Sequence, residues 1–166
     1  MALKKQEFYE GAALYLVAKA GSVKSVRYET PFFVLNERVS VLLKYSTRGR
    51  SPWGFTFTPE EQRGLAARTV GMTTLVGLIC GSDGIAAVTY RSLIDIAPLT
   101  EASIHIACYR AHGKHYEVRG PLGSLDRKVA PSSWRKVLDS QVEEGLRRSC
   151  SNSSGRTELI LCEAYR

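Results

Sequence analysis

The sequence lacks any long hydrophobic run, and none of its stretches approaches the roughly 20 apolar residues that a membrane helix needs. Its first residues are basic but lead into Glu7 and Glu10 instead of an apolar segment, which is not the pattern of a secretory signal. We therefore expect a cytoplasmic protein that is not inserted into a membrane.

The sequence also lacks a C-x-x-C pair, which excludes the common zinc-ribbon and thiol-redox motifs. Its four cysteines, Cys80, Cys108, Cys150 and Cys162, are scattered along the chain, and three of them lie in or beside apolar runs. Such cysteines are typical of reduced, mostly buried thiols in a cytosolic protein. No Ser/His/Asp triad and no phosphate-binding glycine loop is present.

Only three histidines are present, and they form two short patterns, His105-x-x-Cys108 and His112-x-x-His115. Positions three apart on a strand point to opposite faces, so His105 and Cys108 would not converge on one ion. The second pair flanks a turn, but no thiolate or acid completes a set of four ligands. We expect no metal at either pattern.

Cations outnumber acids, with 23 Lys and Arg against 16 Asp and Glu, a net charge of +7 and a pI near 9.4. This balance favours a polyanionic partner, and nucleic acid is the one that we expect. Hydrophobic residues make up 44% of the 166 residues, enough for one globular domain with its own core.

Hydrophobic periodicity and turn residues predict a series of helices and strands. The expected helices are 4–20, with Phe8, Ala12, Tyr15, Leu16 and Lys19 at helical spacing, 58–70, and one opening at Pro131 to Ser133 that carries Trp134, Val137, Leu138, Val142 and Leu146. The expected strands are two short ones within 23–35 broken by Pro31, then 39–45, 55–57, 74–80, 85–90, 103–109, 116–118 and 158–162. We expect the first three to form an antiparallel meander, with a turn at Asn36-Glu37 before 39–45, and 85–90 to return from 74–80 as a hairpin through a turn at 81–84. Thr58, Pro59 and Glu61 form the capping box of the second helix. We predict an α+β fold, a single domain over 1–166 with a mixed sheet flanked by helices.

The strand at 39–45 carries the one charge inside an apolar run, Lys44. Alternation places Val39, Val41, Leu43 and Tyr45 on one face, and Ser40, Leu42, Lys44 and Ser46 on the other. A lysine in this position either reaches solvent at a sheet edge or lines a site.

The order of helix, antiparallel strands, lysine strand, basic loop, capped helix and apolar strand resembles the core of the restriction-endonuclease-like, or PD-(D/E)XK, nuclease superfamily, which includes Holliday-junction resolvases. The resemblance covers about residues 4–95, followed by an extension of about 96–166. It implies a divalent metal held by a proline-aspartate and an acid-x-lysine motif. The matching positions here are Pro31-Phe32 and Leu42-Leu43-Lys44, in which only the proline and the lysine agree with the family.

This departure matters because Mg²⁺ needs carboxylate oxygens, which Leu42 cannot offer. Relocated acids could rebuild a catalytic site with Lys44, and the candidates are Glu7, Glu29 and Glu37. Each of these acids is otherwise a solvated surface residue. We therefore expect no cofactor, and Mg²⁺ only if the protein is a metal-dependent nuclease.

The loop after the lysine strand interleaves cations with aromatic residues, which suits phosphate contacts from Arg48 and Arg50 and base stacking by Trp53. Alternatively, Trp53 anchors the loop on the core while the arginines are only hydrated. A second basic cluster contains Arg110, Lys114 and Arg119, together with His112, His115, Arg127, Lys128, Arg135 and Lys136. The two clusters predict an extended basic face.

These observations predict a nucleic-acid-binding protein on a nuclease-like fold that has lost its metal carboxylates and binds without cutting. Two alternatives stay open: an active Mg²⁺-dependent nuclease with relocated acids, and a protein-interaction or assembly factor that binds an acidic partner or forms a homo-oligomer.

Overall fold

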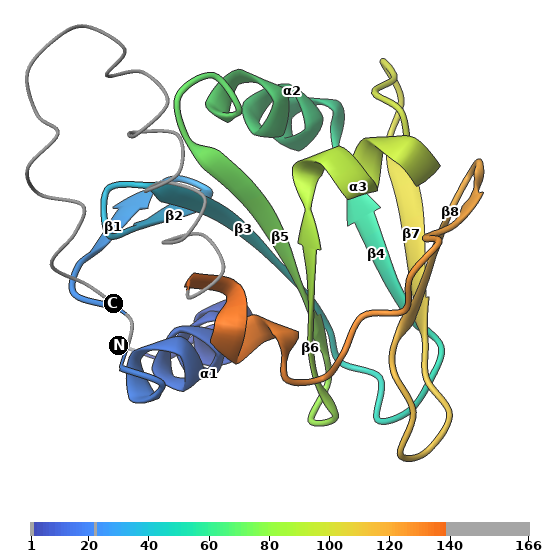
Figure 1. Ribbon diagram of the computed structural model, residues 1–166, viewed down its shortest axis with the longest axis horizontal. Coiled ribbons are helices and arrows are strands. Elements are labelled where there is room, and N and C mark those ends of the chain that lie inside the picture. The colour runs from blue at the N-terminus through green and yellow to red at the C-terminus, as the bar shows by residue number, and fades with distance from the viewer. Residues whose placement is uncertain (1, 22, 139–166) are drawn as a thin grey trace, which may run out of the picture.

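The computed structural model describes residues 2–21 and 23–138, which form an α+β fold with two β-sheets (Figure 1). The helices are α1 (Lys5–Lys19), α2 (Pro59–Arg68), α3 (Tyr90–Ile96) and one at 133–138, where the described residues end. The strands are β1 (Val26–Glu29), β2 (Phe32–Leu35), β3 (Val39–Ser46), β4 (Trp53–Phe57), β5 (Thr73–Cys80), β6 (Gly84–Thr89), β7 (Ile104–Tyr109), β8 (Glu117–Gly120) and β9 (Gly123–Ser124).

The five-stranded sheet, here called sheet A, has the order β1-β2-β3-β5-β6. The strands β1, β2 and β3 form the predicted antiparallel meander, and Asn36 and Glu37 make its second turn with positive φ angles of 51° and 55°. β5 runs parallel to β3, because the connection between them crosses over through β4 and α2, and β6 returns from β5 as the predicted hairpin partner.

The second sheet, sheet B, is antiparallel with the order β4-β7-β8-β9. This corrects the prediction of one mixed sheet. β4 belongs to the expected nuclease-like part of the chain but pairs with β7, so that Phe55 lies opposite Ile106. Trp53, Phe55 and Phe57 alternate along β4 and are buried on one face of it. Their side chains pack in the core between sheet B and sheet A.

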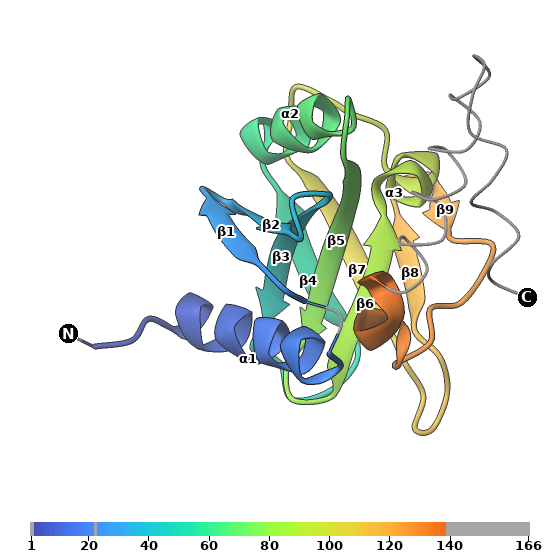
Figure 2. The same ribbon diagram turned by 60° about the vertical axis from the view of Figure 1, so that its left-hand side comes forward.

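The two faces of sheet A cover two separate cores (Figure 2). The inter-sheet core lies between the sheets, with α2 and α3 at its end, and includes Phe32, Leu42, Trp53, Phe55, Phe57, Leu65, Leu78, Ile96, Ile106 and Tyr116. The helix-side core lies under α1 and the helix at 133–138, and includes Ala13, Val17, Phe33, Val41, Leu43, Leu75, Ile79, Trp134 and Leu138. The predicted alternation of β3 is confirmed, because Leu42 belongs to the first core while Val41 and Leu43 belong to the second.

The buried face of α1 is not the one that carries its largest apolar side chains. Phe8 and Tyr15 are 66% and 62% exposed, while Ala13 and Val17 are fully buried. The small Ala13 allows a close approach, and the Nε1–H of Trp134 donates a 2.9 Å hydrogen bond to its carbonyl oxygen. The aromatic stripe of α1 therefore faces outward.

No helix in the described part of the chain is long and apolar enough to cross a membrane. The expected strand at 158–162, the distal half of the expected C-terminal helix, and Cys150 and Cys162 lie outside the described residues.

Candidate functional site

Lys44, the charge inside the apolar strand, is held by a glutamate that the sequence analysis assigned only to a helix cap. Its Nζ lies 2.7 Å and 3.0 Å from the two carboxylate oxygens of Glu61. The two side chains are only 20% and 17% exposed, and the ammonium lies 5.5 Å from the ring centre of Phe57. Glu61 also accepts the backbone N–H of Thr58 at 2.9 Å, so one carboxylate caps α2 and neutralises Lys44.

The positions that would hold a metal in a nuclease are apolar and lie side by side. Phe32 and Leu42 are partners in the β2–β3 register and are 3% and 1% exposed. Both side chains belong to the inter-sheet core, on the Lys44 side of sheet A. Two hydrocarbon side chains offer Mg²⁺ no oxygen ligand.

The three acids proposed as substitutes are not gathered around Lys44. Glu7 accepts the backbone N–H of Lys4 at 2.8 Å. Glu29 pairs with Arg27 and Arg68, and its hydrogen bond to Arg68 lowers the pKa of the Glu29 carboxyl. Glu37 pairs with Arg27 at 3.2 Å. Among residues 2–21 and 23–138, no group of three or more His, Cys, Asp or Glu side chains could hold a metal ion.

Trp53 takes the second of the two roles left open for it. Its side chain is 2% exposed and packs edge-on against Tyr116, and its Nε1–H donates a 2.8 Å hydrogen bond to the carbonyl oxygen of Arg48. A ring held in this way cannot stack on a base, so the expectation of stacking by Trp53 is corrected. Its role is to fix the arginine loop to the inter-sheet core.

Three loops from the two sheets meet at one end of the molecule, at the bottom of Figure 1. We call residues 47–52, 81–83 and 110–116 the basic loop end. The backbone N–H of Gly81 donates to the carbonyl oxygen of Ser46 at 3.0 Å, and that of Arg110 donates to the Ser51 hydroxyl at 3.1 Å. A Cβ on Gly81 would collide with the carbonyl oxygen of Arg48, so this close approach requires glycine.

The only acid of the basic loop end, Asp83, is neutralised within it. One carboxylate oxygen accepts 2.6 Å hydrogen bonds from the Arg110 guanidinium and from the Tyr116 hydroxyl. Burial raises the pKa of Asp83, but these hydrogen bonds outweigh burial, and the net shift of the pKa is downward. Arg110 also donates to the Lys114 carbonyl oxygen at 2.6 Å, which ties the third loop to the second.

The remaining cations of this end are free to meet an anion. Arg48, Arg50 and Lys114 are exposed, and none forms an ion pair with a described residue. Arg119, the other residue predicted to bind nucleic acid, lies instead on β8, where it pairs with Glu117. The structure thus brings together Arg48, Arg50, Arg110 and Lys114, and among the described residues only Arg110 has an ion-pair partner.

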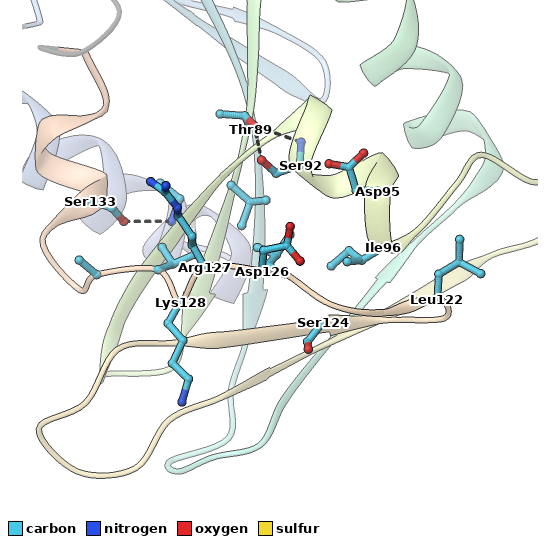
Figure 3. A pocket seen from close by; sticks show the side chains of 15 residues that line it. Thr89, Ser92, Asp95, Ile96, Leu122, Ser124, Asp126, Arg127, Lys128 and Ser133 are labelled. Carbon is cyan, nitrogen blue, oxygen red and sulfur yellow. Dashed lines mark hydrogen bonds between the residues drawn. The ribbon is translucent and has the colours of Figure 1, made fainter.

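A groove lies elsewhere, between α3 and the segment after β9 (Figure 3). It has a volume of about 700 Å³ and was not anticipated from the sequence. Its charged lining residues are Asp95, Asp126, Arg127 and Lys128. Two acids and two cations give it no net attraction for a polyanion, in contrast to the basic loop end.

A second groove, of about 430 Å³, lies between α1 and the β1–β2 hairpin and includes Glu7 and Glu10. Burial, as the largest effect, raises the pKa of Glu10. Two neighbouring carboxylates with one cation, Lys4, make this groove a poor phosphate site.

Comparison of the chain with protein-family models, with curated proteins and with solved structures finds no match.

Proposed function

We propose that this protein binds nucleic acid at the basic loop end and does not cleave it at Lys44. The observation that carries the proposal is the presence of Arg48, Arg50 and Lys114 as exposed cations, with no ion pair to any residue that the structure describes, on loops that are fastened to the core. Neutralising phosphates with such cations releases counterions, which drives binding to nucleic acid. Loops held by Trp53 and Ser51 lose little conformational freedom when they bind.

The arrangement of sheet A supports a nuclease-like scaffold for this function. A helix precedes the antiparallel meander that contains the lysine strand, and a crossover with α2 leads to β5, parallel to β3. This is the element order on which the resemblance to the restriction-endonuclease-like core rests. With Phe32 and Leu42 at the metal positions and Lys44 paired with Glu61, the scaffold supports binding better than hydrolysis.

The test replaces two arginines of the basic loop end together, Arg48→Ala with Arg50→Ala. Binding of labelled single-stranded and duplex oligonucleotides is followed by fluorescence anisotropy over a series of salt concentrations. We expect weaker binding and a salt slope that is lower by roughly 1.5 to 2, since two phosphate contacts are lost. Binding that the double variant leaves unchanged would contradict the proposal.

A matched control removes the same charge at the other end of the molecule. Arg63→Ala with Arg91→Ala changes an exposed residue of α2 and one of α3, near the top of Figure 1. We expect nearly wild-type affinity. An equal loss in both double variants would mean that only net charge matters. Affinity of the wild type that does not depend on salt would favour the alternative of an interaction factor with a protein partner.

Cleavage is tested separately with Mg²⁺ and Mn²⁺. We expect intact nucleic acid with both metals. Cleavage by the wild type that Lys44→Met abolishes, while the variant stays folded, would restore the active-nuclease alternative.

A further inference from the structure

Sheet B has one face that none of the described helices covers. Its inner face packs into the inter-sheet core, whereas α1 and the helix at 133–138 lie beyond sheet A, and α2 and α3 lie over the end of the core (Figures 1 and 2). Alternation along β4, β7 and β8 points a second set of side chains outward: Gly54, Thr56, His105, Ala107, Tyr109, Glu117 and Arg119.

Two flat groups lie on this outer face. The guanidinium carbon of Arg119 lies 4.6 Å from the ring centre of Tyr109. The imidazole of His105 lies over Gly54, since a Cβ there would come within 2.9 Å of the ring, and its Nδ1 lies 3.4 Å from the Thr56 hydroxyl. His105 and Cys108 point to opposite faces of β7, as predicted.

Small residues separate the two flat groups. Gly54 and Ala107 are partners in the β4–β7 register, and Ala107 is also the partner of Arg119. His105 and Tyr109 lie four residues apart on the same face of β7, a distance of about 13 Å at the usual rise of a strand. The two flat groups therefore lie on the same face of sheet B, with Ala107 between His105 and Tyr109 on β7.

This face is continuous with the basic loop end, because Tyr109 is followed directly by Arg110. The charged groups of the face are the carboxylate of Glu117 and the two cations that approach it, Arg119 and Lys128. One acid against two cations leaves the face positive, next to the unpaired Arg48, Arg50 and Lys114. A polyanion bound at the loop end would be led onto sheet B.

We propose that the outer face of sheet B binds unpaired bases of a single strand whose phosphates contact the basic loop end. The inference rests on the proposed function and names its substrate class. Bases stack on the planes of aromatic and arginine side chains, and only unpaired bases can turn a free face toward the protein. In a duplex each base is already stacked on its neighbours, so duplex would use the loop end alone.

The decisive variant is Tyr109→Ala, measured by anisotropy with one labelled strand, as DNA and as RNA, and with the corresponding duplexes. We expect single-strand affinity to fall by roughly 5- to 100-fold, the usual effect of losing one stacking side chain, and duplex affinity to stay unchanged. Tyr109→Phe keeps the ring and should bind as the wild type does.

A second variant guards against misfolding. Thr56→Glu adds a carboxylate at an exposed position of the same face, beside His105, and should weaken single-strand binding by repelling phosphate. Circular dichroism spectra establish that both variants are folded.

The outcomes separate this inference from the proposed function. Loss of binding in the Arg48/Arg50 double variant with full single-strand affinity in Tyr109→Ala would overturn the inference and leave the function standing. Equal losses for duplex and single strand in Tyr109→Ala would also overturn it. A wild-type protein that binds no nucleic acid would overturn both.

Discussion

At the residue scale, the charge of Lys44 is matched by Glu61 in a mostly buried position. Removing one partner of such a pair leaves the other charge poorly solvated. We expect Lys44→Met, which keeps an apolar side chain of similar length, to lower the free energy of unfolding by about 1–3 kcal/mol. Urea denaturation at neutral pH measures this loss.

A double variant, Lys44→Met with Glu61→Gln, tests the same ion pair. It removes the stranded carboxylate, and the amide oxygen can still accept the Thr58 N–H, so part of the stability should return. Lys24→Met, at an exposed position, is the matched control and should change stability by less than about 0.5 kcal/mol. If Lys44→Met is as harmless as this control, the pair does not stabilise the fold.

The thiols of Cys80 and Cys108 are fully buried between the two sheets and form no disulfide. Hydrogen bonding to the Cys108 thiol, and then burial, raise the pKa of Cys80 far above its ordinary value. In a Cys150→Ser, Cys162→Ser chain we expect no rapid reaction with a thiol reagent under native conditions and two reactive thiols in denaturant. Fast labelling of the native protein would contradict this placement.

At the scale of elements, Asp83 joins the β5–β6 turn to the loop between β7 and β8 through Arg110 and Tyr116. Because the pKa of Asp83 is lower in the fold than in the unfolded chain, ionised Asp83 stabilises the protein above its unfolded pKa of about 3.9. That contribution is lost as the pH falls through the lower, folded value. Asp83→Asn should therefore lower the free energy of unfolding at pH 7. On acidification, the variant should lose less of its stability than the wild type does.

The measurement is the free energy of unfolding of both proteins between about pH 6 and pH 2.5. The two curves should converge at low pH, because protonated Asp83 is neutral, as Asn is, and no longer contributes the stability of its ionised form. Glu29 and Glu117, whose pKa values are also lowered, act in both proteins and cancel in the difference. Parallel curves would show that Asp83 gains nothing from its partners.

Local elements could be predicted from the sequence wherever their cause is local. The capping box at Thr58 and Glu61, the turn at Asn36 and Glu37 and the β5–β6 hairpin all depend on neighbours in the chain, and all are present. The alternation of β3 was predicted for the same reason, because a strand has a fixed period of two.

Pairings between distant residues could not be predicted in this way. Lys44 and Glu61 lie 17 positions apart in the chain and are brought together only by the crossover. Likewise, β4 pairs with β7 although residues 58–103 separate the two strands. On α1, the stripe with Phe8 and Tyr15 carries larger side chains than the stripe with Ala13 and Val17. The second stripe is nevertheless the buried one, because its small side chains let Trp134 approach the helix. Periodicity finds both stripes and cannot choose between them.

At the scale of the whole molecule, sheet A is common to both cores. Its Leu42 side packs on sheet B, and its Leu43 side packs on α1 and the helix at 133–138. If either the helices or sheet B detached, one apolar face of sheet A would be exposed to water. The three layers should therefore unfold together. The chain has two tryptophans, and each core contains one of them: Trp53 lies in the inter-sheet core and Trp134 in the helix-side core.

These tryptophans allow the single-domain prediction to be tested with two variants, Trp53→Phe and Trp134→Phe, each of which leaves one fluorescent probe. Each loses an indole N–H bond to a backbone carbonyl, which should lower stability by about 1–3 kcal/mol. Within each variant, the urea midpoint from fluorescence should equal the midpoint from far-ultraviolet circular dichroism, because a shared sheet couples the two cores. If the fluorescence of Trp134 changes at lower urea than the dichroism does, the helix layer unfolds separately while the two sheets stay packed, and the chain is not one cooperative unit.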